Sequence, residues 1–376
     1  MHLIGDLELE AVKRVIEKQK LFRYQVDVES ECQAFEREFA AHLGVKHALL
    51  VTSGTNALVA ALIALGVGPG DEVIIPSYTF FATAQAVYLA GAKPVVINID
   101  KKLSFDLQEV EAHISSHTKA IIPVHMDGLS CDMTGVLALA KKYNLYVIED
   151  TAQALGGSFE GKRLGTWGDV GCFSLNQDKN ITAGEGGIVV TNSDELFEKL
   201  FCLQDGSGFF NPANKDFYKL TTPFVGMSMR VSEITGALAR TQLTRLEGIL
   251  QGLRERKSIF VSELQKQNKV QVVLGSCGAG DCSTSLHLLF SDPMEAQLKG
   301  RLLRERELHC LPPTMRPAHV VWKWGALLKD QKSLSQANFL ATTEILMSLL
   351  KMDISLKWSL KQCEENAQKM LSTIVS

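Results

Sequence analysis

Residues 47–75, HALLVTSGTNALVAALIALGVGPGDEVII, contain two short apolar runs on either side of a longer apolar segment. The runs His47–Val51 and Glu72–Ile75 have the length and the Val, Leu and Ile content of strands. Between them, Thr55–Leu65 has the spacing and length of a helix. This order of strand, helix and strand predicts a βαβ unit, which is the building block of a parallel sheet.

The same alternation continues along the chain to residue 148. Further strands are predicted at Pro94–Ile97, Ala120–Val124 and Tyr146–Ile148, and further helices at Phe81–Leu89, Leu107–Ile114 and Val136–Tyr143. The strands are almost continuously apolar, as expected when helices cover both faces of a sheet. We therefore expect an α/β fold with a parallel or mainly parallel central sheet flanked by helices.

The segments on either side of this region extend the large domain. An amphipathic helix is predicted at 28–43, with Phe35, Phe39 and Leu43 on one face. After residue 170, two strands, Cys172–Leu175 and Gly187–Val190, are joined by a loop, and a long helical segment follows from about Val231 to Leu264. We expect residues 1–249 to form a large ligand-binding domain with this N-terminal helical segment.

The remainder of the chain has its own strands and helices. Strands are predicted near Val270–Val273 and Ser285–Phe290, and helices at Glu295–Glu305 and Ser335–Leu350. This pattern predicts a smaller C-terminal α/β domain at 250–376 that packs on the first.

Charge and cysteine content exclude several classes of function. The net charge of −3 favours neither nucleic acid nor an anionic membrane as a partner. The first twenty residues carry four acidic side chains, unlike a targeting peptide, and no apolar run reaches the roughly 18 residues of a membrane span. The eight cysteines form no CxxC pair and no zinc pattern. We expect a cytoplasmic protein with free thiols and no metal.

Three polar segments interrupt the predicted strands and helices. Thr52–Leu58, TSGTNAL, lies at a helix N-terminus, where it either holds an anion through backbone N–H groups or merely caps the helix. Asp150 follows a strand, at the edge where α/β sheets bind ligands, or else caps the next turn. Lys179 lies in a Gly-rich loop and is either a Schiff-base residue or an ordinary surface lysine.

Pyridoxal phosphate is a ligand that needs all three of these groups. A helix N-terminus binds its phosphate, a carboxylate keeps its ring nitrogen protonated, and a lysine both holds it covalently and moves protons. The order of the three segments therefore favours a pyridoxal-phosphate enzyme over three unrelated structural features.

Five motifs make the chain resemble the DegT/DnrJ/StrS sugar aminotransferases, a branch of the fold-type-I pyridoxal-phosphate enzymes. The resemblance covers about residues 28–250 closely and the rest loosely. The motifs are FEREFAAHLGVKHALLVTSGTNAL (35–58), GDEVIIPSYTFFATAQAVYLAGAKPV (70–95), VIEDTAQALGG (147–157), FSLNQDKNITAGEGGIVVTN (173–192) and GMSMRVSEITGALARTQLTRLE (226–247).

The resemblance implies a role for each matching residue. Lys179 would hold the cofactor and act as the catalytic base, Asp150 would pair with the pyridine nitrogen, and Gln153 would contact the ring hydroxyl. Phe80 would stack on one face of the ring, unless it packs in the core. The phosphate would be held by Gly54, Thr55 and Ser174.

Two positions depart from the family pattern. Ser228 stands where an Asn normally reaches the phosphate in the neighbouring subunit, so the resemblance implies a homodimer with shared sites but leaves this contact in doubt. The family's His-Leu-Tyr-Gly is here His125-Met-Asp127-Gly128. His125 either faces the substrate or is a hydrogen-bonded histidine at a strand end.

Short matches at both ends of the chain resemble the branch that makes 8-amino-3,8-dideoxy-manno-octulosonate, a lipopolysaccharide sugar. They are Phe22-Arg23-Tyr24, and Trp322 and Trp324 with His319 nearby. In that branch the acceptor is a keto-acid sugar without a nucleotide, and Arg23 would suit its carboxylate. The alternative acceptor is a nucleotide-linked sugar for surface polysaccharide or a secondary metabolite.

The implied reaction is ping-pong transamination. Glutamate or glutamine would leave its nitrogen as pyridoxamine phosphate, and a keto- or aldehydo-sugar would then take that nitrogen. A related sugar dehydratase has His at the position of Lys179, so this lysine argues against dehydration. A non-catalytic protein that keeps the fold for binding is the alternative from another class.

Overall fold

The computed structural model describes residues 4–25, 28–207, 219–325, 327–328 and 334–376. In these residues the strands are β1 (His47–Val51), β2 (Glu72–Pro76), β3 (Lys93–Ile97), β4 (Thr118–Ile121), β5 (Tyr146–Asp150), β6 (Ser158–Phe159), β7 (Lys162–Arg163), β8 (Val170–Ser174), β9 (Gly187–Thr191), β10 (Val270–Val272), β11 (Ser285–Phe290) and β12 (Leu349–Asp353).

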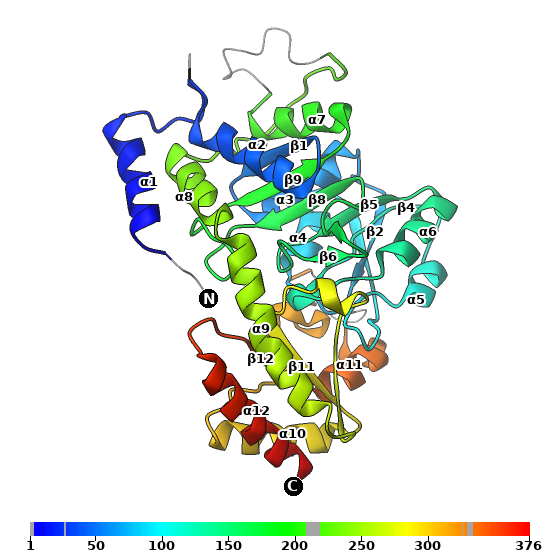
Figure 1. The fold of residues 1–376 in the computed structure, drawn as a ribbon. Helices are drawn as coiled ribbons and strands as arrows, with labels where there is room; N and C mark the ends of the chain where they lie inside the picture. The colour runs from blue at the N-terminus through cyan, green and yellow to red at the C-terminus, as the bar shows by residue number, and fades with distance from the viewer. Residues whose placement is uncertain (1–3, 26–27, 208–218, 326, 329–333) are drawn as a thin grey trace.

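The α-helices and short 3₁₀ helices connect these strands (Figure 1). The α-helices are α1 (Asp6–Glu17), α2 (Glu31–Leu43), α3 (Gly54–Ala64), α4 (Ala82–Leu89), α5 (Leu107–Ala112), α6 (Met133–Tyr143), α7 (Asp194–Gln204), α8 (Glu233–Leu243), α9 (Leu246–Leu264), α10 (Pro293–Glu305), α11 (Leu340–Met347) and α12 (Leu360–Val375). The 3₁₀ helices are η1 (Met126–Gly128), η2 (Gly278–Gly280), η3 (Pro313–Met315), η4 (Pro317–His319), η5 (Val321–Lys323) and η6 (Gln336–Asn338).

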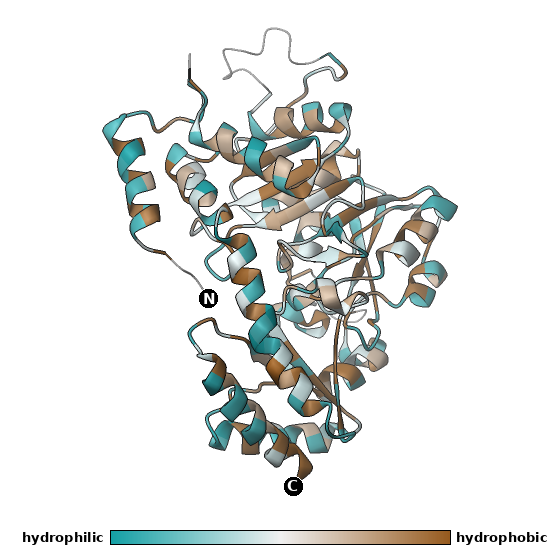
Figure 2. Ribbon diagram, viewed as in Figure 1, coloured by the Kyte–Doolittle hydropathy of each residue, from teal (hydrophilic) through white to brown (hydrophobic). Residues whose placement is uncertain are grey.

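A seven-stranded sheet forms the centre of the molecule, in the order β1-β9-β8-β5-β4-β2-β3. Only β9 runs antiparallel to its neighbours, β1 and β8, so the prediction of a mainly parallel sheet is confirmed. Successive side chains alternate between the two faces of the sheet. In β1, Ala48 and Leu50 join one apolar core, whereas Leu49 and Val51 join the other. Figure 2 shows that apolar residues dominate this sheet.

The strand directions bring the predicted polar segments to one edge. Strands β1, β5 and β8 run in the same direction, and β5 and β8 are direct neighbours. Asp150 ends β5, Ser174 ends β8, and the turn after β1 leads into α3 at Gly54. Three segments that are far apart in the sequence therefore meet at the carboxyl edge of the sheet.

A smaller antiparallel sheet, β10-β11-β12, lies below the first in Figure 1, with α10 and α12 beside it. Helix α9 runs from the end of α8 to this sheet. The predicted boundary at 249/250 falls within the first turn of α9. The division into domains 1–249 and 250–376 stays a prediction.

Two predictions of long helices were wrong. Residues 231–264 contain two helices, α8 and α9, and not one. The Arg245 N–H donates to the carbonyl of Gln242, three residues back, so the regular pattern of the α-helix is broken and a new helix begins after Arg245. Glu8 of α1 holds this corner, since its carboxylate accepts hydrogen bonds from Gln242 Nε2 (2.8 Å) and Arg245 Nε (2.9 Å). Only tertiary contacts with α1 reveal the corner.

The second of these predictions was the helix Ser335–Leu350. Helix α11 ends at Met347, and the apolar residues that follow belong to strand β12. A short apolar run fits a buried strand as well as a buried helix, and here pairing with β11 decides between them. Helices α1, α7 and α12 were not predicted. Among the described residues, no helix is both long enough and apolar enough to cross a membrane.

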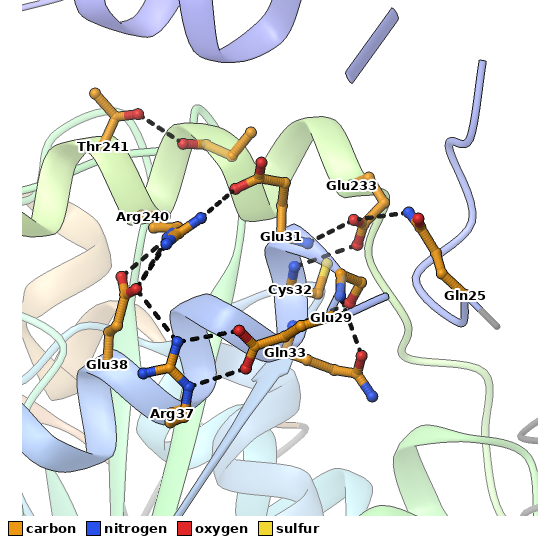
Figure 3. A network of polar contacts seen from close by, with 12 residues as sticks. Gln25, Glu29, Glu31, Cys32, Gln33, Arg37, Glu38, Glu233, Arg240 and Thr241 are labelled. Atoms are coloured by element: carbon orange, nitrogen blue, oxygen red, sulfur yellow. Dashed lines mark hydrogen bonds and ion pairs between the residues drawn. The ribbon is translucent and has the colours of Figure 1, made fainter. Parts of the chain in front are cut away.

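Helices α2 and α8 are joined by a network of charged groups (Figure 3). The Arg240 guanidinium on α8 binds Glu38 of α2 at 2.8 Å and Glu31 at 3.1 Å. The buried carboxylate of Glu233 accepts hydrogen bonds from the backbone N–H groups of Glu31 (2.6 Å) and Cys32 (3.2 Å), at the N-terminus of α2. This network fixes α2 against α8 over one face of the large sheet.

Candidate active site

A cavity of about 880 Å³ lies at the carboxyl edge of the large sheet. The small sheet supplies part of its wall through β11, β12 and the residues next to them. Eight of the residues predicted for the site line this cavity, namely Gly54, Thr55, Phe80, Asp150, Gln153, Ser174, Lys179 and His319.

One end of the cavity is formed by the N-terminus of α3 and the end of β8. The Ser53 side chain accepts a hydrogen bond from Asn56 N–H (3.1 Å) and caps the helix. The N–H groups of the first turn have no partner within their own helix, so they can bind an anion. A Cβ atom on Gly54 would lie 2.9 Å from Ser174 Cβ. Glycine therefore allows the close approach that brings the Ser174 hydroxyl to this end.

Asp150 is a buried carboxylate between neutral hydrogen-bond donors. Thr83 Oγ1 donates to Oδ2 at 2.8 Å, and Ala152 N–H donates to Oδ1 at 3.2 Å. Burial raises the pKa of Asp150, and these two hydrogen bonds oppose that shift only in part. Asp150 forms no ion pair with any described residue. Its site therefore suits a ligand that brings its own positive N–H group.

Lys179 lies in the loop between β8 and β9, and its backbone N–H donates to the carbonyl of Asn176 (3.1 Å). Within the described part of the chain, no hydrogen bond or ion pair occupies its amine. Desolvation lowers the pKa of Lys179, against the attraction of the Asp150 charge. A larger fraction of this amine is therefore neutral and nucleophilic than for a lysine in water.

Phe80 and Gln153 line the cavity between these groups. Phe80 is 45 % exposed, with its ring centroid 5.3 Å from that of His319, so it is not part of the apolar core. The Gln153 side-chain oxygen accepts a hydrogen bond from Asp127 N–H (3.2 Å), which leaves its amide NH₂ to donate. Burial lowers the pKa of His319 to about 4, so this ring is neutral at physiological pH.

Arg23 and Tyr24 lie outside the cavity. The buried Arg23 guanidinium donates to both carboxylate oxygens of Glu36, each at 2.9 Å. The Tyr24 hydroxyl donates to Asp205 Oδ1 at 2.7 Å. Both side chains hold parts of the fold together, so their placement argues against the predicted contacts with a substrate.

His125 is also a structural residue. Its ring is fully buried and does not line the cavity, with Nε2 3.1 Å from Glu149 Oε2. Its Nδ1 accepts a hydrogen bond from Cys131 N–H (3.2 Å). Of the two interpretations of His125, the hydrogen-bonded histidine at a strand end fits this placement, and a contact with substrate does not.

Ser228 lies on the surface, in a β-bridge with Asp205, and does not line the cavity of this chain. An exposed position leaves it open to a second subunit. Its predicted contact with a cofactor phosphate in that subunit stays a prediction.

The lining of the cavity also contains polar residues that sequence reasoning did not select. They are Asp127, Arg316, Lys351 and Asp353, from η1, the end of η3 and β12. These residues are spread over more than half of the chain, and only the packing of β12 beside η1 brings them together. The one signal in the sequence was the departure at Asp127 from the family's His-Leu-Tyr-Gly motif.

The chain is similar to several known proteins. The chain is 44% identical over 223 residues to GDP-perosamine synthase of Caulobacter vibrioides, which covers 59% of this chain and 58% of that protein. It is 42% identical over 234 residues to UDP-N-acetyl-3-dehydro-α-D-glucosamine 3-aminotransferase of Acidithiobacillus ferrooxidans, with 62% and 61% covered. The matched regions thus span about three fifths of these two relatives.

Solved structures and family models extend the match. The structure of an aminotransferase from Psychrobacter cryohalolentis superposes with a TM-score of 0.86 at 27% identity, over 99% of this chain and 98% of that one. The model of the DegT/DnrJ/EryC1/StrS aminotransferase family matches residues 3–314. From its sheet, its site and this match, the chain belongs to the DegT/DnrJ/EryC1/StrS aminotransferase family.

Proposed function

We propose that this protein is a pyridoxal-phosphate-dependent aminotransferase that transfers an amino group from glutamate or glutamine to a keto- or aldehydo-sugar by a ping-pong mechanism. The observation that carries the proposal is one cavity lined by the Lys179 amine, the buried Asp150 carboxylate and the N-terminus of α3. The two sugar-modifying relatives named above support a sugar as the acceptor.

The residues of the cavity fit the cofactor. The first turn of α3 and the Ser174 hydroxyl would bind its phosphate, and the close approach at Gly54 forms that cradle. Asp150 would bind the protonated ring nitrogen, and the Gln153 amide would donate to the ring hydroxyl. When bound, the cofactor supplies an electron sink for the carbanion formed at the substrate's α-carbon.

Lys179 would both hold the cofactor and move the proton. Its amine would remove the α-proton of the amino donor, and it would return a proton in the reverse sense for the acceptor. Its lowered pKa favours the neutral form that can accept a proton. Phe80, exposed in the cavity, would cover one face of the ring and keep water from it.

The identity of the sugar is the finer part of the proposal. Both relatives named above carry a nucleotide-linked sugar in their names. An octulosonate acceptor would need a cation for its carboxylate, and Arg23 is already paired with Glu36. We therefore place nucleotide-linked sugars first and the octulosonate of lipopolysaccharide second.

The proposed function is tested by the colour of the purified protein. Protein loaded with pyridoxal phosphate should absorb visible light, glutamate or glutamine should remove the band, and a keto-sugar should restore it. Lys179→Ala should abolish turnover, whereas Lys46→Ala, at a surface lysine that is 59% exposed, should not. Turnover by Lys179→Ala would refute the mechanism. A protein that cannot be loaded with the cofactor would instead favour the non-catalytic binding protein.

A further inference from the structure

The buried carboxylate of Asp127, which lines the cavity, is a centre of hydrogen bonds. Its Oδ2 accepts from the Tyr78 hydroxyl (3.0 Å) and from His287 Nε2 (3.0 Å), and its Oδ1 accepts from the Lys351 ammonium. Its backbone N–H donates to Gln153 Oε1, as described above. Asp127 thus connects η1 with β11, β12 and the cofactor side of the cavity.

These contacts hold Asp127 in one conformation and one charge state. Its φ of 53° is left-handed, a region that Asp and Asn tolerate better than most residues. Burial opposes its ionisation, but the Lys351 ammonium and the hydrogen bond from His287 together outweigh burial and lower the pKa of Asp127 well below its usual range. Burial also lowers the pKa of His287, so that neighbour is neutral. The negative charge of Asp127 is therefore paired with the Lys351 ammonium.

Lys351 lies between two carboxylates on the wall of the cavity. Its ammonium also approaches Asp353 Oδ1 (3.4 Å), and Asp353 Oδ2 in turn accepts from Arg316 Nη2 (3.1 Å). Lys351, Asp353 and Arg316 all line the cavity. Two positive and two negative groups alternate here, so the wall has little net charge. It nevertheless offers hydrogen-bond donors and acceptors in fixed positions to a ligand in the cavity.

A wall of this kind suits sugar hydroxyls better than a carboxylate. A free carboxylate binds best where positive charge is in excess, and here Asp127 and Asp353 already compensate Lys351. Hydroxyl groups both donate and accept, which matches an ammonium beside a carboxylate. Ser285, whose hydroxyl donates to Asp353 Oδ1 (3.0 Å), adds a further hydroxyl to this wall.

We propose that Lys351 determines specificity for the sugar, because its ammonium, positioned by Asp127, donates a hydrogen bond to a sugar hydroxyl. The proposal rests on the proposed aminotransferase function. An ammonium has three donor protons, and among the described residues Asp127 accepts a hydrogen bond from one of them, while Asp353 lies at ion-pair distance. The ammonium therefore has donor capacity left for a ligand in the cavity. Asp127 acts through Lys351 and is a positioning residue.

The test compares the two kinds of amino compound that the site would accept, an amino acid and an amino sugar. Glutamate and an amino sugar should each remove the visible band of the pyridoxal-phosphate form, because transamination is reversible. The amino sugars are GDP-perosamine, which is linked to a nucleotide, and 8-amino-3,8-dideoxy-manno-octulosonate, which is not. The dependence of the bleaching rate on concentration gives an apparent Kd and a limiting rate for each compound.

Three variants isolate the role of Lys351. The double variant Asp127→Asn with Lys351→Met removes both charges, so it leaves no unpaired charge of this pair buried. Lys351→Arg keeps a cationic donor. Lys257→Met is the control, since Lys257 is also a buried lysine but does not line the cavity. Thermal unfolding of each loaded variant checks that the fold is retained.

We expect the double variant to raise the apparent Kd of the preferred amino sugar about tenfold, the effect of one lost hydrogen bond. Its limiting rate should stay the same, as should both constants for glutamate. Lys351→Arg should retain most of the affinity for the amino sugar. Lys257→Met should have the same apparent Kd and limiting rate as the wild type. The amino sugar that bleaches the wild type shows which kind of sugar the wall takes.

Three outcomes would overturn the proposal. The first is an equal loss of affinity for glutamate and for the amino sugar, and the second is an unchanged Kd for the sugar. The third is a wild-type protein that glutamate bleaches but neither amino sugar does. If glutamate and glutamine also fail to bleach the wild type, the proposed function itself is wrong.

Discussion

At the level of single residues, Lys179 and Asp150 influence each other's pKa in the cavity. Burial penalises both charged forms, so it lowers the pKa of the lysine and raises the pKa of the aspartate. Their mutual attraction opposes both shifts. Asp150 therefore has two effects on function, since it would hold the cofactor ring and its charge also raises the pKa of Lys179 against the effect of desolvation.

This coupling predicts how cofactor loading depends on pH. Only the neutral amine attacks an aldehyde, so the rate of loading rises as the pH passes upward through the pKa of Lys179. Because desolvation lowers that pKa, we expect the midpoint below the ordinary 10.5. Asp150→Asn removes the charge that raises the pKa and should move the midpoint lower still. Stopped-flow absorbance after mixing apoprotein with pyridoxal phosphate measures the midpoint.

Asp6→Asn, at an exposed position on α1, is the control for this measurement and should leave the midpoint unchanged. A midpoint in Asp150→Asn that equals or exceeds that of the wild type would show that Asp150 does not act on Lys179.

At the level of elements, α2 and α8 cross closely enough that only glycine fits at Gly236. A Cβ atom at this position would lie 2.7 Å from the backbone nitrogen of Cys32 and 2.9 Å from its Cα. The backbone of α2 cannot move freely there, because Glu233 binds its N-terminal N–H groups. The intrinsic helix penalty of glycine is thus offset by the close contact between the two helices.

The close contact predicts that Gly236→Ala lowers the free energy of unfolding by about 1–3 kcal/mol, because the helices must separate to admit the methyl group. Gly248→Ala on α9 is the matched control. No atom lies within 4 Å of its Cβ position, so this variant should gain up to about 1 kcal/mol of stability. Urea unfolding followed by circular dichroism measures both. Equal effects of the two substitutions would contradict the assigned crossing.

At the level of the whole molecule, the question is whether the site is completed by a second copy. The cavity is lined by residues of both sheets of one chain, whereas Ser228 lies outside it on the surface. A homodimer in which Ser228 reaches the partner's phosphate site remains the expectation from the family resemblance. Serine is shorter than the asparagine it replaces, so that contact would be weak or mediated by water.

The expected dimer makes Ser228 a site where cofactor retention can be improved. Sedimentation should show a dimer, and Ser228→Asn should slow the loss of pyridoxal phosphate on dialysis, since the longer amide reaches further. Ser228→Ala should speed that loss. Ser258→Asn, on the exposed face of α9, is the control and should have no effect. A monomeric protein, or identical retention in all variants, would refute the shared site.

Local patterns in the sequence were sufficient to predict a mainly parallel central sheet and the polar segments that lie at its carboxyl edge. The strands around residues 47–191 are short apolar runs, and parallel connection through helices forces their carboxyl ends to one edge. Asp150, Ser174 and the turn before α3 stand directly at these ends. Their meeting therefore follows from the order of strands, and the family motifs only assigned their roles.

Other features depended on contacts that no local pattern records. The corner between α8 and α9 is set by Glu8 of α1, and β12 is a strand because it pairs with β11. Arg23 resembled a substrate residue until packing placed Glu36 against it. The sequence by itself determined the sheet and Lys179 with Asp150, because each is fixed by its neighbours along the chain. Only the tertiary structure decided that Asp127 and Lys351 meet in the lining of the cavity, because their contact spans more than two hundred residues of the chain.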